Sequence, residues 1–152
     1  MPEAAASYEV VSRAVICIGG MVLVAQGIGD TFTHLPGGHV EAGEIPGDAL
    51  TREVREELGR EVSEVRFLGT FQNTYDDRAG RHVEEENHVF AVKLYPVLQE
   101  VPAEARESHL KLRWVAIGDL ARPDVNLLPP AIRGYVELAS GAPWAAVWMG
   151  QR

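Results

Sequence analysis

The spacing of hydrophobic positions changes several times along the chain and divides it into predicted strands and helices. Runs that are rich in valine, isoleucine and aromatic residues, with polar residues between them, are typical of strands. We predict strands over Glu9–Ile18, Met21–Ala25, Val62–Tyr75, His82–Tyr95 and Leu110–Val115. The Gly-Gly pair at 19–20 predicts a hairpin between the first two strands, and the polar segment 76–81 predicts a longer hairpin.

One segment has the hydrophobic spacing of a helix that lies on a core. Leu50, Val54 and Leu58 follow one another at four-residue intervals and form a narrow apolar stripe. Pro46 is a favourable first-turn residue, and Gly59 is a favourable residue just after the last turn. The pattern therefore predicts a helix from about Pro46 to Leu58.

A second helix is predicted from the pair Pro129-Pro130 to about Ala139. Its hydrophobic residues predict the face that packs on the core, which consists of Ile132, Tyr135, Val136 and Leu138. The strands and helices together predict the α+β class.

The first helix also carries three glutamates at positions i, i+3 and i+4. Glu53, Glu56 and Glu57 fall within a quarter to a third of the helix circumference, beside the apolar stripe. Like charges at this spacing repel by a few tenths of a kcal/mol for each pair. A bound divalent cation would reverse the sign of that effect, because carboxylates are the hard oxygen ligands that Mg²⁺ and Mn²⁺ prefer.

Composition narrows the function classes. The chain has 152 residues, 46% of them hydrophobic and 24% charged, so we expect a single domain over residues 1–152 with a flexible stretch at 1–7. A net charge of −8 argues against general binding to nucleic-acid backbones. A single cysteine, Cys17, excludes an internal disulfide. We see no apolar run that could span a bilayer and no signal-peptide pattern, so we expect a cytoplasmic protein.

The spacing from the glycines to the glutamates is the strongest signal in the chain. Gly38 is followed after five residues by Glu44, and after seven more by Arg52-Glu53. Glu56-Glu57 and Gly59 complete the pattern. This segment resembles the signature of the Nudix hydrolase family at every fixed position except the last, where Arg60 replaces an aliphatic residue.

The resemblance implies both a fold and a reaction. It implies an α/β/α sandwich in which a mixed sheet carries the signature helix on one face. It also implies an enzyme that cleaves a pyrophosphate bond in a nucleoside di- or triphosphate, or in a nucleoside diphosphate linked to another moiety. The implied cofactor is Mg²⁺, with Mn²⁺ as an alternative. A nucleotide-binding sensor with negligible turnover is the alternative function on the same fold.

The resemblance further assigns roles within the signature. It implies Glu53 and Glu57 as metal ligands, together with the carbonyl oxygen of Gly37. Glu56 is either a third ligand or the group that deprotonates water, and the choice of base between Glu53 and Glu56 stays open. Arg52 is expected to hold a glutamate side chain in place. Glu44 is expected to support the metal ligands without binding the metal itself. Gly38 lets the backbone approach metal and substrate closely.

Outside the signature the candidates are weaker. A further acid is expected, and Glu107 and Glu86 are the two candidates for it. Arg78 and Tyr75 are candidate substrate contacts, because they supply a charge for phosphate and a ring for a base. A proline 15 residues after the signature would mark some ADP-ribose pyrophosphatases, but Tyr75 occupies that position. We therefore expect a nucleotide-type small-molecule substrate, no membrane partner, and a monomer or homodimer.

Overall fold

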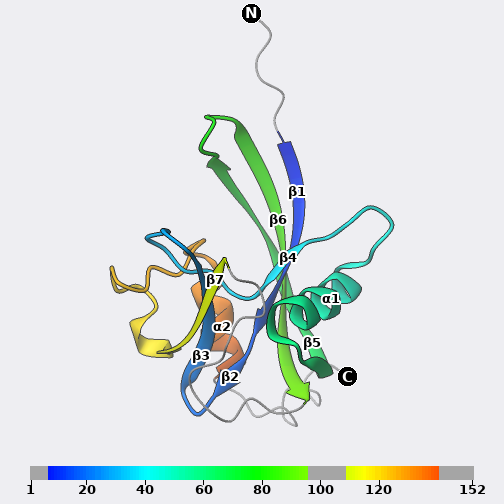
Figure 1. Cartoon of the computed structure of the whole chain (residues 1–152), viewed down its shortest axis with the longest axis vertical. Helices are drawn as coiled ribbons and strands as arrows, with labels where there is room; N and C mark the ends of the chain where they lie inside the picture. The colour runs from blue at the N-terminus through cyan, green and yellow to red at the C-terminus, as the bar shows by residue number, and fades with distance from the viewer. Residues whose placement is uncertain (1–6, 96–108, 141–152) are drawn as a thin grey trace, which may run out of the picture.

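The structure, a computed structural model, describes residues 7–95 and 109–140 and contains seven strands and two α-helices in those ranges (Figure 1). In chain order the elements are β1 (Ser7–Val15), β2 (Cys17–Ile18), β3 (Met21–Gly27), β4 (Gly37–His39), α1 (Pro46–Leu58), β5 (Glu61–Asp76), β6 (His82–Tyr95), β7 (Leu110–Ala116), the 3-10 turn η1 (Ile117–Asp119) and α2 (Ile132–Ser140). The predicted strands and helices are therefore all present in outline.

The strands form two sheets. The larger has the order β4-β1-β6-β5, in which β1 runs parallel to β6 and antiparallel to β4. The smaller has the order β2-β3-β7 and is antiparallel. The larger sheet is mixed, as the family resemblance implies. Figure 1 shows the long β5–β6 hairpin rising beside β1, with α1 on one side and the smaller sheet and α2 on the other.

Helix α1 packs on the larger sheet through its predicted apolar stripe. Leu50, Val54 and Leu58 are buried in one core cluster with Ala14 of β1 and Phe90 of β6. Burial of such side chains contributes about 1.5–3 kcal/mol each. The helix ends where Gly59 takes a left-handed conformation with φ of 65° and donates its N–H to the carbonyl of Arg55. This packing fixes which face of α1 turns away from the core.

Helix α2 covers a second core cluster on the other face of the sheet. Ile132 and Val136 are buried there, and Tyr135 stacks on Phe71 with ring centroids 5.5 Å apart. The prediction that Leu138 also faces inward is wrong, because 56% of it is exposed. Ala139 packs against the cluster instead. Residues four apart lie on the same face of a helix, so Ala139 shares the inner face with Tyr135 and Leu138 is turned away from it.

Two further predictions about the first half of the chain need correction. The strand expected over Glu9–Ile18 divides: β1 ends at Val15 and joins the larger sheet, and only the short β2 pairs with β3 in the hairpin. Residues 37–39, for which no strand was predicted, form β4. Ser7, expected in the flexible stretch, pairs with Val83, while residues 1–6 lie outside the described residues.

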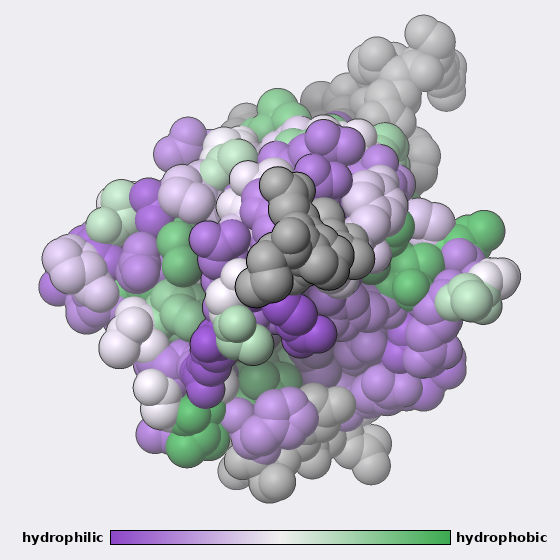
Figure 2. Space-filling view, turned by 90° about the horizontal axis from the view of Figure 1, so that it is seen from above, coloured by the Kyte–Doolittle hydropathy of each residue, from purple (hydrophilic) through white to green (hydrophobic). Residues whose placement is uncertain are grey.

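The surface of the described residues is mostly hydrophilic in the view of Figure 2. Seen from above, hydrophilic side chains cover most of it, and hydrophobic groups appear in smaller patches between them (Figure 2). In residues 7–95 and 109–140, none of the helices has the length and apolarity needed to cross a membrane.

Candidate active site

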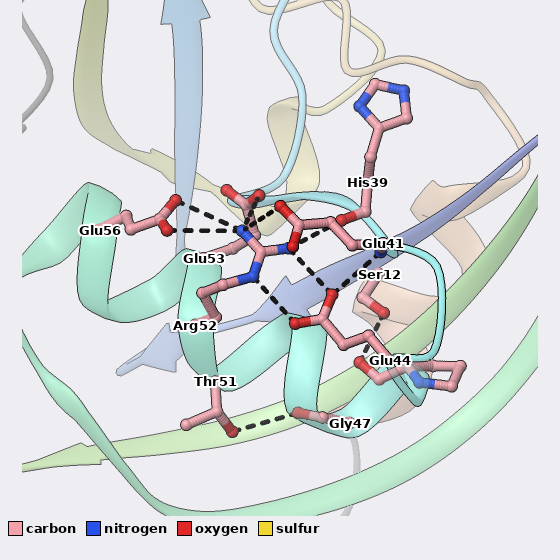
Figure 3. Close-up of polar contacts among 10 residues, drawn as sticks. Ser12, His39, Glu41, Glu44, Gly47, Thr51, Arg52, Glu53 and Glu56 are labelled. Carbon is pink, nitrogen blue, oxygen red and sulfur yellow. Dashed lines mark hydrogen bonds and ion pairs between the residues drawn. The ribbon is translucent and has the colours of Figure 1, made fainter.

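Arg52, in the middle of α1, lies at the centre of a group of carboxylates (Figure 3). Its Nε and Nη2 donate to the two carboxylate oxygens of Glu44 at 2.9 and 3.0 Å. Its Nη1 donates to Glu53 at 2.9 Å and to Glu56 at 3.4 and 3.5 Å. Nη2 also donates to the carbonyl of His39 at 2.9 Å. One guanidinium therefore fixes three glutamates and ties α1 to the end of β4.

The bidentate contact between Arg52 and Glu44 is the strongest electrostatic pair of the group. The pKa of Glu44 is lowered from 4.5 to about 2. The hydrogen bond from Arg52 makes the largest contribution, and the hydrogen bond from the Glu41 backbone N–H makes the second largest. The same pairing raises the pKa of Arg52. Both groups are charged at neutral pH, so Glu44 supports the site as an anchored carboxylate.

The three helix glutamates differ in exposure. Glu57 is 3% exposed and accepts the backbone N–H of Gly37 at 3.4 Å, whereas the side chain of Glu53 is 15% exposed and that of Glu56 is 48% exposed. The acidic face thus runs from a buried carboxylate to a solvent-facing one. A ligand that approaches from solvent meets Glu56 first and Glu57 last. We call Glu44, Arg52, Glu53, Glu56 and Glu57 the carboxylate cluster.

Two glycines of β4 bring the backbone close to this cluster. A Cβ on Gly37 would lie 1.9 Å from the carbonyl oxygen of Ser12, and the residue has a φ of 140°. A Cβ on Gly38 would lie 2.6 Å from the Glu53 carboxylate. Gly37 is therefore required for the β1–β4 pairing, and Gly38 for the approach of Glu53 to the strand.

The donor set suits a hard divalent cation. Several carboxylates on one helix face, next to the backbone of β4, are the oxygen donors that Mg²⁺ and Mn²⁺ prefer. As the side chains stand in residues 7–95 and 109–140, no three or more His, Cys, Asp or Glu groups are already arranged around a common metal position. Arg52 occupies the space between Glu53 and Glu56 instead. The donor chemistry fits, and the carboxylates would have to turn toward an ion.

A pocket of about 460 Å³ lies on the face of the larger sheet that is opposite to α1. We call it the Glu85 pocket. It is lined by Arg13, Phe32, His34, Asn73, Tyr75, Glu85, Leu128, Pro129 and Pro130. Rings and aliphatic groups supply most of its walls, and a few polar groups are set among them, which is the usual composition of a small-molecule site.

The polar groups of the Glu85 pocket have defined charge states. Burial, followed by the charge of Arg13, lowers the pKa of His34 to about 4, so His34 is uncharged at neutral pH. Burial and the nearby carboxylates of Glu9 and Glu85 raise the pKa of Tyr75, whose hydroxyl therefore stays protonated. Arg13 and Glu85 are the basic and the acidic residue in the wall of the described pocket.

The carboxylate cluster and the Glu85 pocket are connected through β4. Arg13, in the pocket wall, pairs with Gly37 across the β1–β4 register. The N–H of Gly37 in turn donates to Glu57 of the cluster. One strand edge therefore separates the carboxylates from the pocket, which is an arrangement that suits one ligand with two chemically different ends.

The residues predicted outside the signature lie in different places. Tyr75 lines the Glu85 pocket, as a candidate base contact would. Arg78 lies in the turn of the β5–β6 hairpin, where it pairs with Asp30 at 3.0 Å. Glu86 points to the opposite face of β6 from Glu85 and contacts His88 at 3.1 Å. Glu107 lies outside the described residues. The substrate and metal roles of these four stay predictions.

Sequence reasoning missed Glu85 and Asn73. Glu86, the candidate predicted from this stretch, lies on the opposite face of β6 from Glu85. The buried position of Glu85 could have been found from the pattern, because Val83, Asn87 and Val89 share its face and are also buried. Asn73 lies directly opposite Glu85 on β5, a pairing that only the hairpin register supplies.

Comparison with known proteins agrees with this geometry. Residues 9–134 match the NUDIX domain. The chain belongs to the Nudix family. A Nudix protein of Mycobacterium tuberculosis named "Putative 8-oxo-dGTP diphosphatase 2" is 33% identical over 132 residues, which cover 84% of this chain and 85% of the relative. The chain is accordingly a Nudix pyrophosphohydrolase that acts on a nucleotide-type substrate.

Solved Nudix structures have the same fold. The solution structure of the E. coli ORF135 protein is 27% identical, has a TM-score of 0.61, and covers 91% of this chain and 95% of its own. The crystal structure of a MutT NUDIX hydrolase from Burkholderia pseudomallei is 24% identical, also with a TM-score of 0.61, and covers 86% and 97%. Because its sequence identity is only 24%, the Burkholderia pseudomallei structure supports a shared fold and no statement about activity. Members of this family generally depend on divalent metal ions, and the carboxylate cluster is the matching feature here.

Proposed function

We propose that this Nudix enzyme hydrolyses a purine nucleoside triphosphate between the α- and β-phosphates, with 8-oxo-dGTP as the first candidate. The support is the connection through β4. The carboxylate cluster suits a divalent cation that binds the phosphates, and the Glu85 pocket suits a base. The Mycobacterium tuberculosis relative carries the name of that activity. The products are a nucleoside monophosphate and inorganic pyrophosphate.

The residues of α1 would hold the divalent cation. Glu53, Glu56 and Glu57 supply carboxylate oxygens, and the Gly37 carbonyl, which belongs to the strand that contacts Glu57, is a further candidate ligand. When bound, Mg²⁺ or Mn²⁺ neutralises phosphate charge and acidifies a water molecule. The repulsion among the three glutamates is relieved at the same time.

The chain's own groups divide the remaining work. Arg52 pairs with Glu53 and Glu56 and so offsets the repulsion between them before an ion binds, and the two carboxylates would turn from this position toward the ion. Glu44 orients Arg52 from the opposite side. A carboxylate of this cluster accepts the proton of the attacking water as the new P–O bond forms and the bridging P–O bond breaks. Glu53 and Glu56 are the two candidates, because Arg52 contacts both.

The test is a panel of nucleoside triphosphates, nucleoside diphosphate sugars and dinucleoside polyphosphates, each incubated with Mg²⁺ or Mn²⁺ and analysed by chromatography. We expect 8-oxo-dGTP and dGTP to yield the nucleoside monophosphate and inorganic pyrophosphate. Their kcat/KM values should be higher than those of the other substrates in the panel. Turnover confined to a nucleoside diphosphate sugar would overturn the substrate assignment. Tight nucleotide binding with no turnover of any compound would instead support the sensor alternative.

A further inference from the structure

Glu85 is a buried acidic residue whose burial its protein neighbours do not explain. It is 8% exposed, and within the described residues its hydrogen-bond donor is the side-chain amide of Asn87 at 3.0 Å, with no ion pair to another described side chain. Burial of a carboxylate without a cationic partner is costly. Asn87 is itself completely buried, so it holds one oxygen of Glu85 in a fixed position.

The neighbours of Glu85 belong to the pocket wall. Asn73 lies directly opposite it on β5, and Tyr75 follows two residues later on the same face of that strand. On the other side, the register of β1 places Glu9 opposite Glu85, where Glu9 contacts His39 at 3.0 Å. The carboxylate of Glu85 therefore supplies two acceptor oxygens to this wall of the pocket. It favours a ligand edge that carries donors.

We propose that Glu85 determines base specificity by accepting two adjacent N–H donors from a guanine-type base. The donors are the ring N1–H and the exocyclic 2-amino group, which match the two oxygens of one carboxylate. This assignment rests on the proposed function, since it places the base of the substrate in the Glu85 pocket. It names the chemical edge that the pocket recognises, which neither the family nor the relatives' names specify.

The rest of the pocket fits the same base. Phe32, Tyr75 and the Pro129-Pro130 pair supply flat and apolar surfaces for the faces of a purine. Arg13 supplies a donor for a purine oxygen or for the α-phosphate, and it is the wall residue next to Gly37 in the register. Adenine would place a ring nitrogen lone pair against the carboxylate, and a pyrimidine with a single N–H would leave one oxygen without a donor.

The test compares substrates that differ by one group. dITP is dGTP without the 2-amino group, so the ratio of their kcat/KM values measures the contact with that group. We expect the wild-type ratio to favour dGTP by about tenfold to a hundredfold. Glu85→Gln keeps an oxygen for Asn87 but replaces the other acceptor by a donor, so it should bring the ratio close to one.

The matched control is Glu84→Gln, the same chemical change on the adjacent exposed residue of β6. It should keep the wild-type ratio. Glu85→Asp is a second variant that keeps the charge but shortens the reach, and it should lower the ratio without abolishing the preference. Thermal melts establish that each variant is folded.

The outcomes separate this inference from the proposed function. Calorimetric binding of dGMP and dIMP to the wild type and to the variants gives the same comparison without turnover. If no triphosphate is hydrolysed but dGMP still binds more tightly than dIMP through Glu85, the proposed reaction fails and the specificity assignment stands. If dGTP and dITP are hydrolysed equally, or folded Glu85→Gln keeps the wild-type ratio, Glu85 does not recognise the base.

Discussion

The carboxylate cluster and the Glu85 pocket are built in opposite ways. The cluster comes from one continuous segment, with Glu44 and Arg52 only eight residues apart and the other three acids on the same helix. The pocket is assembled from five segments that begin with Arg13 and end with Pro130. Helix geometry alone brings the first group together, whereas the second depends on the register of three strands and on the chain before α2.

Under the proposed function, the difference means that this fold separates reaction from recognition. A locally encoded cluster changes little when distant loops change, so the chemistry can stay constant. A pocket built from distant segments can be altered one wall at a time. The predictions below disturb the cluster, the strand between the two regions, and the support of the cluster, in order of decreasing effect.

The largest effect is expected from Glu57→Gln. Loss of one carboxylate from the cluster should lower kcat/KM by about a thousandfold, because charge stabilisation by a bound cation contributes several kcal/mol. The melting temperature should stay unchanged or rise, since Gln still accepts the Gly37 N–H and the cost of burying a charge is removed. Steady-state kinetics and calorimetry measure both quantities.

The control for that prediction is Glu61→Gln, which neutralises an exposed acid just beyond the end of α1. Glu61 pairs with Arg55 on the surface, and such pairs contribute little. Its activity should match the wild type. Unfolding of Glu57→Gln together with normal specific activity in the folded fraction would remove Glu57 from the metal site.

The second prediction compares two alanine substitutions in β4. Gly38→Ala places a Cβ against the flexible carboxylate of Glu53, so the chain should fold while Glu53 moves aside. If Glu53 has the catalytic or metal-binding role proposed for it, a displacement of about an ångström should lower kcat by up to about a hundredfold. Gly37→Ala instead meets the backbone of Ser12 at a φ of 140° and should destabilise the fold by about 3 kcal/mol.

Urea denaturation and activity assays on both variants distinguish the two roles. Each substitution adds the same methyl group to β4, so each variant serves as the control for the other. Equal losses of stability in the two variants would mean that the backbone, rather than the Glu53 carboxylate, limits the space at Gly38.

The third prediction concerns the support that Arg52 gives to Glu44, Glu53 and Glu56. Arg52→Gln should lower activity by about tenfold, the loss typical of a residue that positions metal ligands. The pairing lowers the pKa of Glu44 from 4.5 to about 2, so its contribution to stability is fully present above pH 4.5. That contribution is lost as the pH falls toward 2.

Chemical denaturation at several pH values measures this effect. The wild type should be more stable than Arg52→Gln at pH 7, and the difference between them should shrink below pH 4.5. Arg55→Gln is the matched helix control and should keep its activity, because Arg55 pairs with Glu61 away from the cluster. A stability difference that stays constant from pH 7 to pH 3 would contradict the role of the Arg52–Glu44 pair.

The sequence predicted the cluster well because its determinants are local. The four-residue interval of Leu50, Val54 and Leu58 fixed the buried side of α1, and this left the glutamates beside it. The spacing of Arg52 and Glu56 predicted their contact, which the structure contains. The same local logic failed at Leu138, because the inner face of a helix of nine residues depends on how the helix is rotated against its sheet.

The sequence by itself thus determined the family, the reaction class and the acidic face of one helix. The tertiary structure alone decided that β1 leaves its expected hairpin to join β4 and β6, that Gly37 lies opposite Arg13, and that Glu85 rather than Glu86 enters the pocket. The physical reason is the range of the interactions. Helix periodicity acts over a few residues, whereas strand register and pocket walls are fixed by hydrogen bonds and packing between segments far apart in the chain.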